Sequence, residues 1–152
     1  MTRISRDESL LRMLHAVAER SSCLRNQVGA LIVRGGRVVS QGYNGAPPGK
    51  PHCTPETCNT QSPCLSTVHA EANAIAFAAR HGIPTEGAWM YCTYSPCLDC
   101  AKLILSSGIK LLAFERAYRD PTPLDFLHYE ISYGDQVTVQ KIVDGERVEY
   151  FR

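Results

Sequence analysis

The sequence has no excess of charge, no long apolar run and no repeated or low-complexity segment. Its 16 Lys and Arg residues against 15 Asp and Glu residues give a formal net charge of +1, which offers no electrostatic basis for binding a nucleic acid. No window approaches the roughly 20 apolar residues of a membrane-spanning helix. The N-terminus, Met1-Thr2-Arg3-Ile4-Ser5-Arg6-Asp7-Glu8, turns polar and charged at once, unlike a signal peptide. We therefore expect a cytoplasmic protein with no nucleic-acid partner and no membrane association.

The 152 residues have the composition of an ordinary globular protein, with 44% hydrophobic and 20% charged residues. This length suits one domain with a buried core, and no boundary is visible. We predict a single domain over residues 1–152 with a Cys- and Pro-rich insert at about 44–67. An unstructured segment of that length is uncommon in a compact domain, so the insert is expected to be functional or pinned by a metal.

Helical and strand-like hydrophobic patterns alternate along the chain. Helices are predicted at residues 7–20, 68–80, 96–107 and 123–129. Strands are predicted at residues 28–33, 38–43, 89–93, 110–115, 137–143 and 147–151. The first two strands and the last two form hairpins, the second around Asp144-Gly145. This order predicts an α/β sandwich with its functional site at the carboxyl edge of the sheet.

Two motifs at predicted strand-to-helix junctions carry the chemistry: His69-Ala70-Glu71 and Ser95-Pro96-Cys97-Leu98-Asp99-Cys100. The imidazole of His69 and the thiolates of Cys97 and Cys100 suit a tetrahedral Zn²⁺ and leave its fourth position open for water, as in catalytic sites. Helix N-termini favour thiolate over thiol. A structural zinc would need a fourth Cys or His close by, and residues 65–105 place none suitably.

Glu71 lies two residues beyond the histidine, close enough to move protons without being a ligand. Because Zn²⁺ lowers the pKa of bound water to about 7, Glu71 is predicted to take the water proton and pass it to a ring nitrogen and then to a departing amine. The alternative is a structural zinc with Glu71 as a solvated helix residue. The combined pattern H-x-E…P-C-x-x-C is the signature of the zinc nucleobase deaminases.

Within the cytidine/deoxycytidylate deaminase superfamily, the chain resembles the deoxycytidylate (dCMP) deaminases. The zinc motif fixes only the superfamily, whereas Tyr43-Asn44-Gly45-Ala46-Pro47 followed by His52-Cys53 narrows it. Further matching segments run from Ser22 to Ala30, from His69 to Ile75 and from Thr93 to Lys102. The resemblance implies a three-layer αβα sandwich with a mixed five-stranded sheet. It also implies zinc-dependent hydrolysis of dCMP to dUMP and ammonia, supplying dUMP for thymidylate synthesis.

The same resemblance assigns roles to substrate-binding residues. Asn44 is expected to hydrogen-bond the sugar hydroxyl, the Ala70 backbone to read the pyrimidine edge, and the Ser95 carbonyl to accept from the amine being lost. Tyr118 aligns with a substrate-contacting tyrosine. The alternatives are a left-handed turn residue for Asn44 and a surface aromatic for Tyr118.

A monophosphate substrate needs Arg, Lys or backbone N–H donors. Arg25 is the first candidate because it precedes the first strand in a segment that the family shares. Arg119 and Lys50 are the next candidates. The alternative for either arginine is a solvated surface residue.

Seven cysteines without a secretion signal favour metal binding over disulfides. Some dCMP deaminases carry an auxiliary structural zinc at positions matching Cys23 and Cys53. The remaining ligands there are histidines that this chain lacks in those places. We expect Cys58 and Cys64 to substitute, with His52 as an alternative for one of them, giving a second zinc that pins the insert. The alternative is four reduced, unliganded thiols.

The resemblance also implies a homo-oligomer, with a hexamer favoured, and regulation by dCTP and dTTP with Mg²⁺. Two other functions stay open. One is deamination of a related free nucleotide or nucleoside, such as dCTP, a 5-modified dCMP or cytidine. The other is a non-catalytic, zinc-stabilised nucleotide-binding module, against which the intact Glu71 argues.

Overall fold

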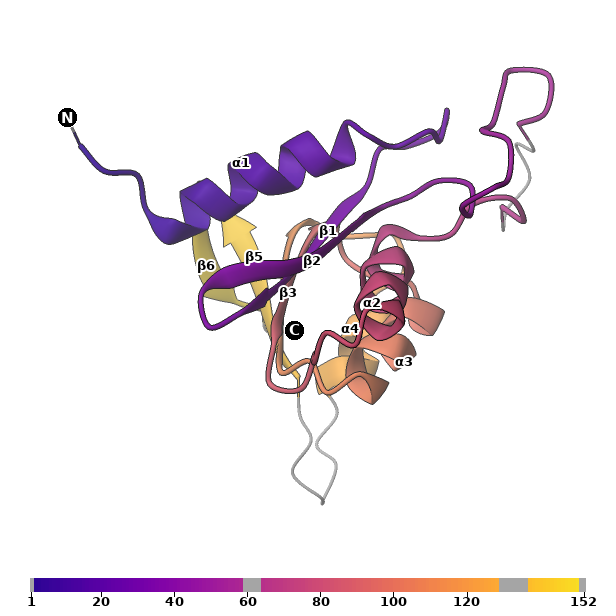
Figure 1. The fold of residues 1–152 in the computed structure, drawn as a ribbon. Coiled ribbons are helices and arrows are strands. Elements are labelled where there is room, and N and C mark those ends of the chain that lie inside the picture. The colour runs from indigo at the N-terminus through magenta and orange to yellow at the C-terminus, as the bar shows by residue number, and fades with distance from the viewer. Residues whose placement is uncertain (1, 59–63, 129–136, 151–152) are drawn as a thin grey trace.

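The computed structural model describes residues 2–58, 64–128 and 137–150 (Figure 1). In chain order the elements are α1 (Arg6–Ala18), β1 (Gly29–Arg34), β2 (Arg37–Tyr43), α2 (Ala70–Arg80), β3 (Trp89–Tyr94), α3 (Leu98–Ser106), β4 (Leu111–Arg116), α4 (Thr122–His128), β5 (Thr138–Val143) and β6 (Glu146–Glu149). The last predicted residue of one helix, Tyr129, and of one strand, Phe151, lie outside the described residues, as do residues 59–63 of the insert.

One mixed sheet organises the molecule, with strand order β2-β1-β3-β4-β5-β6. The pairs β1–β2, β1–β3 and β5–β6 are antiparallel, whereas β3–β4 and β4–β5 are parallel. Parallel neighbours need crossover connections, and here α3 and α4 supply them. The expectation of a five-stranded sheet is wrong, because the terminal hairpin adds β6 at the edge of the sheet.

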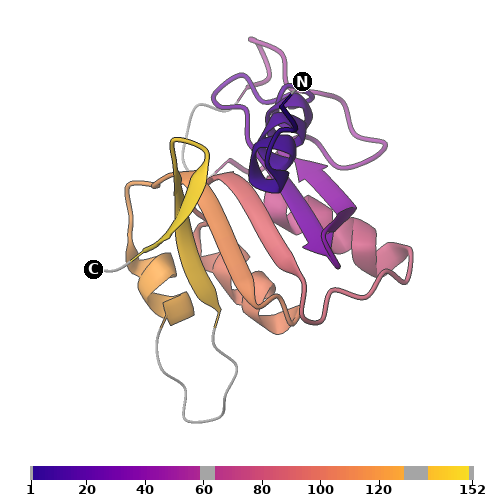
Figure 2. The same ribbon diagram turned by 90° about the vertical axis from the view of Figure 1, so that its left-hand side faces the viewer.

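The helices α2, α3 and α4 pack on one face of the sheet and α1 packs on the other, so the fold has layers of helix, sheet and helix (Figures 1 and 2). Alternate residues of β3 and β4 divide between two apolar clusters, as the period of two in a strand requires. Met90, Cys92, Leu112 and Phe114 pack toward α2, α3 and α4. Tyr91 and Ala113 pack toward α1.

Local sequence explains where the helices and turns lie. Ser5 caps α1, and its Oγ accepts from the Glu8 N–H at 3.0 Å, as Ser with Glu three residues later predicts. Gly82 follows α2 with a φ of +66°, the left-handed conformation that favours glycine after a helix. Asp144 (φ +51°) and Gly145 (φ +83°) make the tight turn between β5 and β6. The predicted terminal hairpin is present with this turn.

Two predicted helix starts are early by two residues. α2 begins at Ala70 and α3 at Leu98, because His69 (φ −69°, ψ 154°) and Cys97 (φ −75°, ψ 171°) are extended N-cap residues. The longest helix, α1, has only 13 residues, and none of the helices in the described ranges has the length and apolarity of a membrane span.

Candidate metal centre and its surroundings

His69 and Cys97 occupy the same position at the starts of neighbouring helices. Each is the N-cap of its helix, α2 or α3, and neither side chain makes a capping hydrogen bond. Cys100 follows one turn into α3, on the same face as Cys97. Cys97 Sγ lies 3.4 Å and Cys100 Sγ 3.5 Å from His69 Nδ1. The two helix starts therefore turn one imidazole and two thiols toward a common point.

The spacing of these three side chains fits a zinc ion. Their ligand atoms all lie within 4.8 Å of one another. With Zn–S of about 2.3 Å and Zn–N of about 2.0–2.1 Å, tetrahedral geometry puts sulfur and nitrogen about 3.5 Å apart. The observed separations of 3.4 and 3.5 Å match that value. This centre is the one such group of His, Cys, Asp and Glu among the residues that the structure describes.

The two thiols share one proton unequally. Hydrogen bonds with Cys100 and His69 lower the pKa of Cys97 to about 3, which favours the thiolate at this sulfur. The same Cys97–Cys100 hydrogen bond, followed by burial, raises the pKa of Cys100. Hydrogen bonding to Cys97 raises the pKa of His69. Metal binding displaces the remaining protons, because zinc binds thiolate and neutral imidazole.

Glu71 is buried beside the centre in the first turn of α2, with a relative exposure of only 4%. Burial raises the pKa of its carboxyl group, while the charge of His69 opposes this shift. A buried carboxyl with a raised pKa exchanges protons closer to neutral pH than an exposed one. Glu71 is therefore suited to proton transfer.

A close contact between β2 and α2 fixes the position of α2 relative to the sheet, and with it the positions of His69 and Glu71 at the start of that helix. A Cβ added to Gly42 would overlap the carbonyl oxygen of Ala70 and lie 2.5 Å from the amide nitrogen of Ala74. Ser40 Oγ donates to the Ala74 carbonyl at 2.7 Å, and Asn73 Nδ2 donates to the Tyr43 carbonyl at 2.7 Å.

The ends of the insert meet immediately before His69. Gly45 and Val68 form an isolated antiparallel bridge, with N–H···O distances of 3.1 and 2.9 Å in the two directions. This bridge closes the insert at its base, and the chain continues from Val68 directly to the metal ligand His69.

Family models and solved structures place this arrangement among known proteins. Residues 4–115 match the model of the cytidine and deoxycytidylate deaminase zinc-binding region. The chain belongs to the cytidine and deoxycytidylate deaminase family. It is 42% identical over 120 residues to ComE operon protein 2 of Bacillus subtilis, covering 78% of this chain but 64% of that protein. It is 34% identical to the deoxycytidylate deaminase of Enterobacteria phage T2, covering 76% of this chain and 82% of the relative.

The fold comparison agrees with the family membership. A crystal structure of the dCMP deaminase from cyanophage S-TIM5 in complex with dCMP and dUMP matches 93% of this chain and 99% of that chain. Its TM-score is 0.77 and its sequence identity 28%. The structure of a deaminase/reductase from Thermotoga maritima, at 23% identity, matches with a TM-score of 0.63 and shares the fold.

Two residues that the deaminase resemblance assigns to the substrate hold local structure. The Asn44 side chain is buried: its Oδ1 accepts from the Val28 N–H at 2.8 Å and from Ser21 Oγ at 2.6 Å. Its Nδ2 donates to the Asn26 carbonyl at 2.8 Å. The amide has a second N–H that these bonds do not use. Ser95 is also buried, and its Oγ accepts from the Tyr118 N–H at 2.6 Å.

The other predicted residues differ in exposure. Ala70 is fully buried at the start of α2, beside the metal centre. Tyr118 has a relative exposure of 47%, and Arg119 follows it on the surface. Arg25 lies elsewhere, on the wall of a groove.

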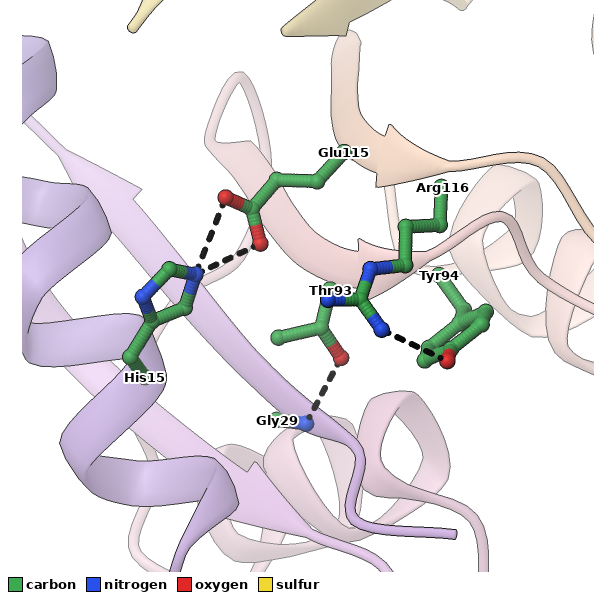
Figure 3. A network of polar contacts seen from close by, with 6 residues as sticks. All are labelled: His15, Gly29, Thr93, Tyr94, Glu115 and Arg116. Atoms are coloured by element: carbon green, nitrogen blue, oxygen red, sulfur yellow. Dashed lines mark hydrogen bonds and ion pairs between the residues drawn. The ribbon is translucent and has the colours of Figure 1, made fainter.

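That groove, called the β3–β4 groove below, has a volume of about 640 Å³ and opens where β3 and β4 end. Its walls include His15, Arg25, Asn26, Tyr94, Glu115 and Arg116. Figure 3 shows the polar contacts along it: the His15 ring contacts Glu115 on one side, and the Arg116 guanidinium donates to Tyr94 Oη at 3.1 Å on the other. Sequence reasoning missed Arg116 and Tyr94, because their proximity depends on the parallel β3–β4 register.

The cysteines expected to hold a second zinc are Cys23, Cys53, Cys58 and Cys64. All four are reduced and part-buried, and the metal-binding geometry found among the described residues does not include them. Cys64 bonds Thr67 at 3.4 Å. Cys92, by contrast, is fully buried in the core, where burial raises the pKa of its thiol.

Proposed function

We propose that the protein is a zinc-dependent deaminase that hydrolyses dCMP to dUMP and ammonia. The observation that carries this proposal is the His69–Cys97–Cys100 cluster with the buried Glu71 beside it, in a chain of the deaminase family. The choice of dCMP is supported by relatives described as deoxycytidylate deaminases and by the similar structure that contains dCMP and dUMP.

The reaction replaces the cytosine amine with oxygen. His69, Cys97 and Cys100 would hold Zn²⁺, which would make a hydroxide nucleophile available near neutral pH. The Glu71 carboxylate takes a proton from the attacking water and gives it to the ring nitrogen next to the reacting carbon. It then moves the second water proton to the amine, which leaves as ammonia when the carbon–nitrogen bond breaks.

Backbone groups near the centre orient the base in this proposal. The Ala70 N–H lies in the first turn of α2, where N–H groups point out of the helix, and reads the pyrimidine edge. The Ser95 carbonyl accepts from the amine being lost. Side chains contact the rest of the substrate. Asn44 donates to the sugar hydroxyl through the side-chain N–H that is not used in its structural hydrogen bonds, and Tyr118 contacts the substrate. Arg119 is, after Arg25, the second candidate for binding the phosphate.

A substrate panel tests the proposal. Ammonia release and the ultraviolet change are measured with dCMP, 5-methyl-dCMP, dCTP, deoxycytidine and cytidine, with Glu71→Gln as the control. The proposal predicts turnover of dCMP that the control loses. Turnover of only another compound in the panel would support the zinc chemistry and assign a different substrate. Binding of dCMP without turnover would instead support a nucleotide-binding module.

The proposal includes further features. Composition and length favour a cytoplasmic protein of one domain. The family resemblance implies a homo-hexamer, effector binding by dCTP and dTTP with Mg²⁺, and a structural zinc, whose proposed ligands here are Cys23, Cys53, Cys58 and Cys64. Elemental analysis tests the structural zinc: two zinc ions per chain are expected, falling to one in Cys58→Ser. One zinc in both proteins would contradict it.

A further inference from the structure

Arg116 lies on the same side of the sheet as the metal centre. Even-numbered residues of β3 and β4, such as Cys92 and Phe114, pack toward the helices that carry the metal ligands. Because side chains alternate along a strand, Tyr94 and Arg116 extend that row, and their backbones are register partners.

The carboxylates of the β3–β4 groove lie on the side of the sheet that faces α1, opposite to the side that carries the metal centre. Glu115 and Thr93 belong to the odd-numbered row, which faces α1. The His15 ring contacts both oxygens of Glu115, at 2.9 and 2.7 Å, and Figure 3 shows this pair pointing away from Tyr94. Glu19, the remaining carboxylate of the groove, is the C-cap of α1. The side of the groove that faces the metal centre therefore presents Arg116.

Tyr94 orients the Arg116 guanidinium in two ways. Its hydroxyl accepts a hydrogen bond from Arg116 at 3.1 Å, and the guanidinium carbon lies 5.6 Å from the ring centroid. Guanidinium groups stack on aromatic faces and bind phosphate in a forked geometry. An exposed arginine held in this way loses less conformational freedom when it binds an anion.

Two connections join the groove to the metal centre and to the predicted substrate-binding residue Asn44. Tyr94 is followed directly by Ser95 and then by the ligand Cys97. Asn26, on the groove wall, accepts from the Asn44 side chain at 2.8 Å.

We propose that Arg116, oriented by Tyr94, binds the 5′-phosphate of the substrate in the β3–β4 groove together with Arg25 and so selects nucleotides over nucleosides. This inference rests on the proposed deaminase function. Arg116 acts on binding of the phosphate and not on the reacting atoms. Tyr94 acts through Arg116 and is a positioning residue.

Steady-state kinetics of Arg116→Gln with dCMP and deoxycytidine test the proposal. We expect KM for dCMP to rise about tenfold, the size of a lost charge-assisted contact at an exposed site, with kcat changed less than about twofold because the contact is made equally in ground and transition states. Kinetics with deoxycytidine stay unchanged. Arg116→Lys keeps part of the dCMP binding, and Tyr94→Phe gives a smaller rise in KM.

Arg34→Gln is the matched control, because Arg34 is an exposed arginine at the far end of β1. Ionic strength supplies a readout that a merely structural role does not move: KM of the wild type for dCMP rises with salt, and it rises less steeply in Arg116→Gln. Equal losses with dCMP and deoxycytidine, or no change with dCMP, would overturn the assignment of Arg116.

Calorimetric binding separates this inference from the proposed function. If the wild type fails to turn over dCMP, the proposed function fails. The phosphate assignment still predicts weaker binding of dCMP to Arg116→Gln, with deoxycytidine binding unaffected. Equal dCMP affinity in the two proteins would reject it.

Discussion

Gly42 is the position where one added methyl group should disturb the metal centre from a distance. A Cβ there would overlap the Ala70 carbonyl oxygen and crowd the Ala74 nitrogen. These are backbone atoms of α2 and cannot rotate away as a side chain does. The bonds Ser40–Ala74 and Asn73–Tyr43 hold α2 against β2. In Gly42→Ala, α2 must therefore shift as a unit at its first two turns.

The expected magnitude follows from this overlap. Overpacking at a tight contact costs about 1–3 kcal/mol of unfolding free energy, which lowers Tm by about 2–12 °C for a chain of this size. Because His69 and Glu71 flank Ala70, zinc affinity should fall as well, by about tenfold or more.

Thermal unfolding and zinc competition with a chromophoric chelator measure the two effects. Gln41→Ala, at the exposed neighbouring position of β2, is the control and should match the wild type. Wild-type Tm and zinc affinity in Gly42→Ala would refute the reasoning that this contact sets the position of α2.

Three further predictions concern other parts of the molecule. Asn44→Ala leaves the Val28 N–H and the Asn26 carbonyl without their partner, so unfolding free energy should fall by about 1–3 kcal/mol in denaturant titrations; an unchanged midpoint would contradict this role. Chelation should abolish activity and leave helical circular dichroism largely intact, with zinc restoring turnover, because the two apolar clusters do not depend on the metal; collapse of the signal would contradict this independence of the fold from zinc. Burial, with a hydrogen bond to Asp7, raises the pKa of Tyr91, so the folded state holds its proton more tightly and stability should fall as pH rises above about 10. Tyr91→Phe should flatten that fall in pH-dependent unfolding, and an identical pH profile would contradict the assignment.

Much of the fold could be predicted from local sequence signals. Ser5 and Glu8 mark the start of α1, Gly82 the end of α2, and Asp144-Gly145 the last turn, because each acts on its own backbone. The strand count was wrong because it was taken from the resemblance, whereas the hydrophobic pattern contains six strand-like segments. The helix starts were misplaced because His69 and Cys97 end extended segments.

The candidate site was only partly predictable for a related reason. The motif spacing indicates that His69, Cys97 and Cys100 share a metal, and the structure brings the three together. Arg116 carries no motif, since its relation to Tyr94 arises from strand pairing across 22 residues. The fit of Gly42 against α2 is likewise a tertiary contact, and a lone glycine in a strand does not reveal its neighbour.

The most direct test of the account is conversion of dCMP to dUMP by the zinc-loaded wild type and by Glu71→Gln at equal zinc content. We predict dUMP formation by the wild type and a rate about 10²–10⁴-fold lower in the variant, with zinc retained because Glu71 is not among the ligands. Equal rates in the two proteins, or no dUMP from the wild type, would contradict the assignment of Glu71 and of the reaction.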